Sequence, residues 1–260
     1  NGQVWYNSTT QILKGFKSNP AAGTWASGGN LNNARWVYAS GAGTQTAGLT
    51  YGGEPGTFAN ETESYNGSSW TETGDLNTGR AAGSAGGDSS TSALYAIGTD
   101  PGATTANVES FDGSSWTEIA NVNTARQYGA AGHSSSTAGL VFGGFGPPTV
   151  YPNTESFNGS SWTEVSDLNT GRRSVAGNGA PTAAICMGGH PSLANTEDWN
   201  GTSWTEVADQ SNGGGGASFG TSTSALKNSG TTSEIWNGTA WSSGTSSSNN
   251  LNNRSGLGTT

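Results

Sequence analysis

One segment of this chain recurs with almost the same sequence, and this repetition constrains the fold more than any other feature. The segment "TESFNGSSWTEVSDLNTGR" spans residues 154–172, and "TESYNGSSWTETGDLNTGR" spans residues 62–80. A third version, "NVESFDGSSWTEIANVNTAR", spans residues 107–126. The residues of an active site usually occur once in a sequence, whereas the residues of a repeated structural unit occur again in every copy. The repeats therefore predict an architecture assembled from similar units.

A tryptophan near the end of each unit sets the period. It recurs as Trp25, Trp70, Trp116, Trp162, Trp204 and Trp241, at intervals of 45, 46, 46, 42 and 37 residues. Periods of about 40 to 50 residues are typical of β-propellers with four strands per blade and of some helical solenoids. The units are crowded with glycine and β-branched residues and show no 3.6-residue apolar pattern, which argues against helices. The spacing therefore predicts an all-β propeller.

Each unit divides into four strand-like segments. In the unit that begins at Arg126, they are residues 126–134, 138–144, 153–159 and 160–165. An Asn-Gly or Asp-Gly pair separates the third segment from the fourth, and this pair is a strong hairpin signal because its central residues adopt positive φ. The pairs are Asn66-Gly67, Asp112-Gly113, Asn158-Gly159, Asn200-Gly201 and Asn237-Gly238. The four Asn-Gly pairs also begin Asn-x-Ser/Thr sequons, which the turn explains without glycosylation.

The order of the recurring residues in each unit resembles the kelch motif. Two glycines end the second strand, an aromatic residue lies in the third, and a tryptophan begins the fourth. The resemblance covers about Trp25 to Arg254, although residues 225–230 lack the double glycine and no arginine precedes them. It implies a propeller, a fold that in this family carries binding proteins and a few enzymes. The sequences of residues 2–17 and of the tandem "ESFNGSSWTEV" units (155–165) resemble those of kelch-like proteins encoded in marine bacteriophage tail-fibre or virion genes.

The number of blades depends on how the ends of the chain are read. Five complete units run from Arg35 to Trp241. Residues 1–31 read as a hairpin followed by a fourth strand, while residues 249–260 begin a unit and stop. We expect residues 1–260 to form one propeller domain of six blades, in which these two end segments complete the split blade and so hide its edges. The alternative is a five-bladed ring with a separate N-terminal hairpin.

Composition narrows the classes of function. The 260 residues include 9 basic and 18 acidic side chains, a net charge of -9, and no basic cluster, so nucleic acid is not an expected partner. No apolar run is long enough to span a bilayer. Cys186 is the only cysteine, so no intramolecular disulfide is possible. The chain begins at Asn1 without a methionine or a signal peptide, which we interpret as a fragment or a processed product.

Several polar and aromatic residues recur once per unit. They are Arg80, Arg126 and Arg172, then Glu63, Glu109 and Glu155, and the tryptophans Trp70, Trp116, Trp162 and Trp204. Arginine and glutamate can be catalytic, but repetition in every unit favours a structural role. We expect Arg–Glu pairs or Arg-to-backbone bonds that fix the blades, and tryptophans that pack in the core.

No metal or cofactor site is expected. His133 and His190 occupy different places in their units, with no cysteine or carboxylate at zinc-ligand spacing. No Asp-x-Asp-x-Asp loop suggests calcium. Cys186 lies in the apolar run "AAICMGG" and is expected to be a small buried side chain rather than a nucleophile.

Function is expected where the copies differ, and the loops between the second and third strands differ most. These loops are residues 54–61, 99–107, 145–153 and 190–195. In a four-stranded meander they emerge on the same face as the blade-to-blade connections. They carry Phe58, Phe145, Tyr151 and His190, and exposed aromatics among small polar groups suit recognition of a glycan or a protein surface. The alternative is that they are ordinary loops that shield the ring.

These observations predict a non-enzymatic recognition or display module, located on a virion or outside the cell. Its expected partners are host surface polysaccharide or other virion proteins, with a homo-oligomer within a fibre also open. A secreted glycan-active enzyme and a purely structural decoration protein are the alternatives. An enzyme should break its repeat at one place with clustered carboxylates, arginine or histidine, and the divergent unit 213–241 carries only Lys227 and Glu234 as charges.

Overall fold

The computed structural model describes residues 4–7, 12–15, 29–35, 38–54 and 57–245. Within them the chain forms five four-stranded antiparallel sheets, each a meander in which consecutive strands pair. The first sheet contains β3 (Ser40–Thr44), β4 (Ala47–Tyr51), β5 (Thr62–Tyr65) and β6 (Trp70–Thr73). The second contains β7 (Ser84–Ser89), β8 (Ser92–Thr99), β9 (Thr104–Phe111) and β10 (Trp116–Ile119).

The remaining sheets repeat this plan. The third contains β11 (Ala130–Ala131), β12 (Gly139–Phe142), β15 (Thr154–Phe157) and β16 (Trp162–Val165). The fourth contains β17 (Ala176–Ala180), β18 (Ala183–Met187), β19 (Thr196–Trp199) and β20 (Trp204–Val207). The fifth contains β21 (Ala217–Gly220), β22 (Ala225–Ser229), β23 (Thr232–Trp236) and β24 (Trp241–Ser243). A small hairpin, β13 (Phe145–Gly146) and β14 (Thr149–Val150), is inserted between β12 and β15.

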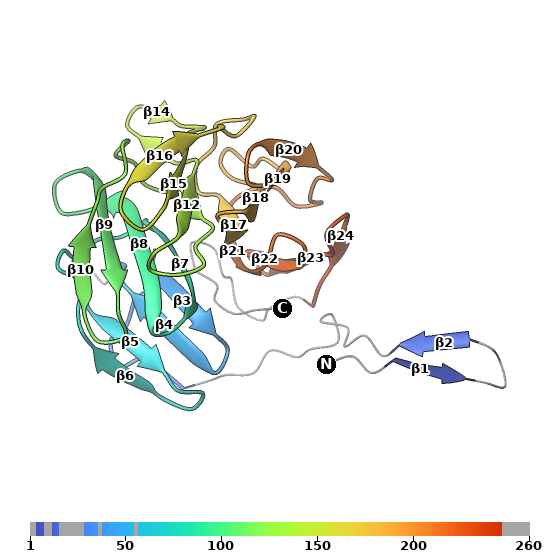
Figure 1. Cartoon of the computed structure of the whole chain (residues 1–260), viewed down its shortest axis with the longest axis horizontal. Helices are drawn as coiled ribbons and strands as arrows, with labels where there is room; N and C mark the ends of the chain where they lie inside the picture. Colours follow the sequence, from blue (N-terminus) through green and yellow to red (C-terminus); the bar gives the residue numbers. More distant parts are fainter. Residues whose placement is uncertain (1–3, 8–11, 16–28, 36–37, 55–56, 246–260) are drawn as a thin grey trace.

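The sheets stand side by side around a common axis in chain order, which is the arrangement of a β-propeller (Figure 1). Their first strands, β3, β7, β11, β17 and β21, face this axis and together line two cavities along it. Where five strands converge, little room remains for side chains, and these strands are rich in glycine, alanine and serine. A Cβ on Gly177 would lie 2.6 Å from the Phe142 ring, for example, so the innermost strand has to be small there.

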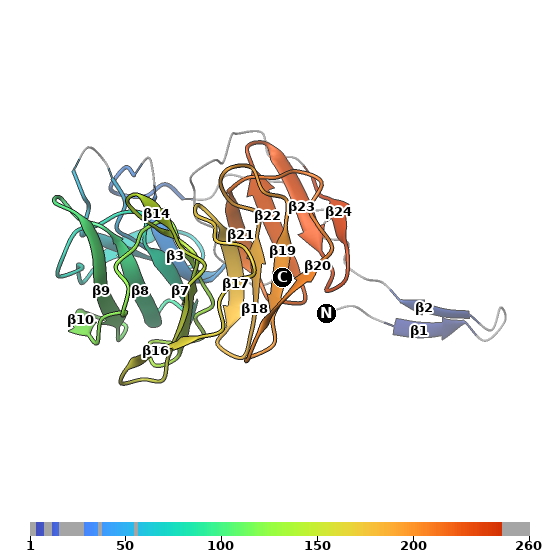
Figure 2. The ribbon, with the colours of Figure 1, turned by 90° about the horizontal axis from the view of Figure 1, so that it is seen from above.

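The described part of the chain therefore contains five blades, which is the number that the sequence analysis gave as the alternative, and a sixth is not confirmed. The expected N-terminal hairpin is formed by β1 (Val4–Asn7) and β2 (Ile12–Gly15), a separate two-stranded sheet that lies apart from the blades (Figures 1 and 2). The segments expected to complete a sixth blade, residues 21–28 and 249–260, lie outside the described residues.

The Asn-Gly and Asp-Gly turns are confirmed as hairpin turns. Gly159 has φ of 97°, in the left-handed region that glycine tolerates. The Asn158 carboxamide oxygen accepts hydrogen bonds from the backbone N–H groups of Ser160 and Ser161, both at 3.0 Å. Asp112 makes the same contacts with the Ser114 and Ser115 N–H groups, so the motif fixes the turn with either side chain.

The repeated tryptophans of the second to fifth blades attach each blade to the unit before it. Trp116, at the start of β10, is 5% exposed, and its indole N–H donates to Thr62 Oγ1 of the first blade at 2.9 Å. Trp204 makes the same bond to Thr154 Oγ1 of the third blade at 3.0 Å. Trp162 is also buried, whereas Trp70 of the first blade is half-buried. These tryptophans therefore fill the space between neighbouring sheets.

The connection that leads into each blade is held by a set of contacts that we call the Arg–Glu clamp. In the third blade, Arg126 Nη1 lies 2.6 Å from Glu155 Oε1, and both side chains are fully buried. Glu155 also accepts hydrogen bonds from the Asn123 and Thr124 N–H groups, at 2.6 and 3.2 Å. The matching pairs are Arg80–Glu109 at 2.5 Å, Arg35–Glu63 at 3.6 Å, and Arg172–Glu197. Each clamp joins a connection to the third strand of the blade that it enters.

The fifth blade keeps this design with a different cation. Lys227 comes from β22 and is 2% exposed. Its ammonium group donates to Gln210 Oε1 at 2.5 Å and to the Gly214 carbonyl at 2.7 Å. Glu234 accepts from the Ser211 N–H at 2.8 Å, as the clamp glutamates of the other blades do. Burial lowers the pKa of Lys227 to about 8.

Candidate ligand-binding site

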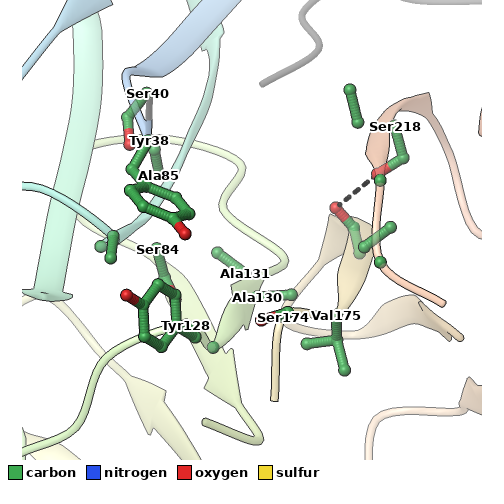
Figure 3. Close-up of a pocket in the computed structure, with 18 of the residues that line it drawn as sticks. Tyr38, Ser40, Ser84, Ala85, Tyr128, Ala130, Ala131, Ser174, Val175 and Ser218 are labelled. Atoms are coloured by element: carbon green, nitrogen blue, oxygen red, sulfur yellow. Dashed lines mark hydrogen bonds between the residues drawn. The ribbon is translucent and has the colours of Figure 1, made fainter. Parts of the chain in front are cut away.

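The axis of the propeller is hollow, and one of its openings lies on the face that carries the loops between second and third strands. We call this the loop face. The cavity at this opening has a volume of about 150 Å³ and is lined by the beginnings of all five first strands. Its wall is made mainly of Ala, Gly and Ser, including Ser40, Ser84, Ser174 and Ser218 (Figure 3). The Ser84 hydroxyl is buried and has no hydrogen-bond partner among the described residues.

Two tyrosines stand at this opening. The rings of Tyr38 and Tyr128 meet edge to face, with centroids 5.2 Å apart and planes at 63° (Figure 3). Both residues have positive φ, 56° and 60°, which is uncommon for bulky side chains. Tyr128 is held there by its N–H, which donates to the Ala82 carbonyl of the second blade at 2.8 Å. Burial, with a smaller effect of the Tyr38 phenol, raises the pKa of Tyr128 to about 12.

A second group of side chains adjoins the tyrosines on the loop face. The Arg173 guanidinium carbon lies 4.2 Å from the centroid of the Phe145 ring. The His190 N–H donates to the Arg173 carbonyl at 2.7 Å, and the side chain of His190 is exposed. The charges of Arg173 and Glu54 both act on the Tyr128 hydroxyl, the first lowering its pKa and the second raising it. Phe145 belongs to the third blade, whereas Arg173 and His190 belong to the fourth, so the group bridges two blades.

The residues predicted for binding are thus only partly brought together. Phe145 contacts the Arg173 guanidinium through its ring, whereas His190 is joined to Arg173 through the backbone. Tyr151 is half-buried and its N–H donates to the Gly144 carbonyl at 2.9 Å. Its ring lies close to the Gly146 backbone, since a Cβ on Gly146 would be 2.9 Å from Tyr151 Cε2. Phe58 is half-buried on the loop of the first blade, and no ring contact among the described residues joins it to the other three.

Sequence reasoning missed Tyr38, Tyr128 and Arg173. A signal was present one to three residues after the repeated arginine of each connection, where Tyr38 is the third residue after Arg35. Arg80 is followed by two alanines, Arg126 by Gln127 and Tyr128, and Arg172 by Arg173 and Ser174. The copies therefore differ there as strongly as they do in the loops, and Tyr38, Tyr128 and Ser174 line the cavity at the loop face.

The opposite opening of the channel is lined by a different set of residues. The cavity there has a volume of about 310 Å³, and His133, Asn178 and Ser222 are among its lining residues. His133 is 4% exposed, and burial lowers its pKa to about 3. Its Nδ1 accepts a hydrogen bond from the Leu140 N–H at 3.2 Å, which places the proton of the neutral ring on Nε2. Within the described residues, that Nε2 has no partner.

The remaining candidate for chemistry, Cys186, lies in β18 within a core cluster that includes Phe142 and Trp199. Burial raises the pKa of its thiol to about 12, so the thiol is protonated at neutral pH. The described residues bring no three His, Cys, Asp or Glu side chains together in a way that would hold a metal ion.

Comparison with known proteins gives no assignment. No protein-family model matches the chain, and no curated protein sequence matches it. In the part of the chain that the structure describes, no helix is long and apolar enough to cross a membrane. The functional interpretation therefore rests on the geometry of the loop face.

Proposed function

We propose that this chain is a non-enzymatic recognition module that binds a saccharide on its loop face, at the mouth of the axial channel. The observation that carries the proposal is the group formed by Phe145, Arg173 and His190 beside Tyr38 and Tyr128. It places aromatic rings, a planar cation and phenolic hydroxyls next to one another on one surface. Saccharide sites combine such rings, which pack on the apolar face of a sugar, with a few polar groups that fix its orientation.

The biological setting that we propose rests on the resemblance of the repeat sequences to those of kelch-like phage proteins. A phage virion or tail-fibre component that contacts host cell-surface polysaccharide, outside the cell, fits a rigid propeller with one variable face. Each copy needs only weak binding in that setting, because many copies on one particle raise the overall avidity. Other virion proteins and further copies of this chain within a fibre are additional partners in this proposal.

A binding role is favoured over catalysis by the state of the repeated charges. The carboxylates of Glu63, Glu109 and Glu155 are buried and accept hydrogen bonds from their own blade connections. Side chains used in this way hold the fold together and face no cavity through which a substrate enters. The enzyme alternative requires a free acid–base pair, and the structural-decoration alternative requires a loop face without affinity for any ligand.

The test is binding of the purified protein to a glycan array and to polysaccharide extracted from host cells. We expect Phe145→Ala combined with Tyr151→Ala to abolish binding while the melting temperature stays nearly unchanged. The matched control is Tyr65→Ala, which removes a half-buried ring at the end of β5 away from the loop face. Undiminished binding by the double variant contradicts the proposed site, and a collapsed thermal transition shows that these rings belong to the core.

A further inference from the structure

The basic side chains of the propeller are almost all engaged inside it. Arg35, Arg80, Arg126 and Arg172 are paired with glutamates in the clamps. Lys227 is buried against Gln210 and the Gly214 carbonyl. Of the basic side chains that the structure describes, this leaves Arg173, which is half-buried on the loop face.

Arg173 is held in position, but its hydrogen-bonding groups are not used. Phe145 lies against one face of the guanidinium, at 4.2 Å from Cζ to the ring centroid. Stacking of this kind orients a guanidinium and leaves the N–H donors at its edge free. No hydrogen bond or ion pair occupies those donors within the described residues. Arg172, the preceding residue, differs completely, because its guanidinium is buried and bonded to Glu197, Asn195 and Gly188.

The backbone around Arg173 fixes the place of this cation. Arg173 pairs with His190, and Phe145 pairs with Gln127, through isolated β-bridges. The Gly144 N–H donates to the Arg172 carbonyl at 2.8 Å and so ties the third blade to the connection that carries Arg173. A guanidinium that is already oriented and partly removed from water loses little entropy when it binds a partner.

A chain with a net charge of -9 has many carboxylates that could pair with one half-buried arginine, yet Arg173 has none as an ion-pair partner within the described residues. We infer that the partner comes from the ligand: Arg173 binds a carboxylate of an acidic saccharide, and this contact sets the specificity of the site. The inference rests on the proposed function and names its ligand class. A carboxylate matches the paired N–H groups of a guanidinium in a bidentate arrangement.

The adjoining groups suit the rest of such a ligand. The Tyr128 phenol, protonated because its pKa is about 12, donates or accepts a hydrogen bond to a sugar hydroxyl next to the carboxylate. The small cavity between the five first strands admits a substituent of a few atoms, and the Ser84 hydroxyl in its wall lacks a partner within the described residues. Phe145 acts as a positioning residue, since Arg173 covers one face of its ring.

The experiment compares binding of the full chain to three soluble polymers by isothermal titration. The polymers are polygalacturonate, its fully methyl-esterified form, which keeps the sugar and removes the charge, and a sulfated galactan. We expect polygalacturonate to bind about tenfold or more tightly than the ester, the effect typical of one charge-assisted hydrogen-bonded contact. Arg173→Gln should remove that preference, and Arg173→Lys should restore part of it because the charge returns without the paired donors.

Two further measurements separate the outcomes. Phe145→Leu should weaken the preference for the acid, because the guanidinium loses its aromatic support, and the thermal transition of all three variants should stay near that of the wild type. Equal binding of acid and ester, or a preference that survives in Arg173→Gln, overturns the inference while the proposed function stands. Preference for the sulfated polymer over polygalacturonate overturns the assignment to a carboxylate. Absence of binding to any saccharide, on these polymers and on the array, overturns both.

Discussion

The buried histidine at the far end of the channel makes the fold sensitive to acid in a way that one substitution tests. In the folded protein burial keeps His133 neutral, with a pKa of about 3, against 6.5 for an exposed imidazole. The unfolded chain therefore binds a proton between these two pH values that the folded chain does not. Stability rises with pH wherever the unfolded state binds more protons, so acidification through this window favours unfolding.

The size of the effect follows from the two pKa values. Each pH unit below 6.5 lowers the free energy of unfolding by about 1.4 kcal/mol until the folded pKa is reached. Between pH 6.5 and pH 4 the loss attributable to this one ring is roughly 3 kcal/mol. That is a large share of the roughly 5 to 15 kcal/mol by which domains are usually stable.

The perturbation is His133→Gln, whose amide oxygen can still accept the hydrogen bond from the Leu140 N–H. Urea denaturation, followed by tryptophan fluorescence at a series of pH values between 4 and 7, gives the free energy of unfolding of both proteins. We expect the wild-type curve to fall more steeply than that of the variant, by roughly 3 kcal/mol over this range. His190→Gln, which removes the exposed histidine, is the matched control. Parallel curves for the wild type and His133→Gln would refute the reasoning, whatever their absolute stabilities.

Three further outcomes are expected. Arg126→Ala should lower the free energy of unfolding by about 3 to 5 kcal/mol in urea titrations, because Glu155 is left as a buried unpaired charge; full stability combined with lost binding would contradict a structural role. The wild type should gain thermal stability as pH rises from about 8 to about 10.5, where the unfolded chain retains the Lys227 proton that the folded chain loses. Lys227→Met should abolish that gain, and an unchanged slope would show that Lys227 is not its source. Gly177→Ala should cost about 1 to 3 kcal/mol, because its Cβ would overlap the Phe142 ring; a neutral effect in thermal melts would show that the inner strands are not tightly packed.

The architecture of the blades was predictable because its determinants are local. An Asn-Gly pair fixes its own hairpin, and a strand of four or five residues between turns has few other options. The number of blades was harder to predict, because it depends on whether the two ends of the chain pair with each other in one blade. The buried cation of the divergent fifth unit was also hidden in the sequence. There, Lys227 on β22 replaces an arginine of the connection, so an alignment of the units shows only that the arginine is missing.

The loop face was predictable only in part. Phe145 and His190 could be chosen because their loops differ between units, but their common neighbour could not. Arg172 and Arg173 are adjacent and chemically identical, yet the first is buried in a clamp and the second lies half-buried against the Phe145 ring. The meeting of Tyr38 with Tyr128 joins residues from the first and third units, and only the curvature of the ring brings them together.

The Arg–Glu clamp also explains why nearly the same sequence segment recurs in the chain. Asn123, Arg126 and Glu155 lie less than one repeat period apart in the sequence, so one repeat length contains all the parts needed to fasten its own connection. The tryptophan of that copy, Trp162, then reaches back to the Ala120 carbonyl at the end of the preceding unit. A duplicated stretch of the gene of about 46 codons therefore carries every contact that one blade needs to fasten its own connection and to bond to the unit before it.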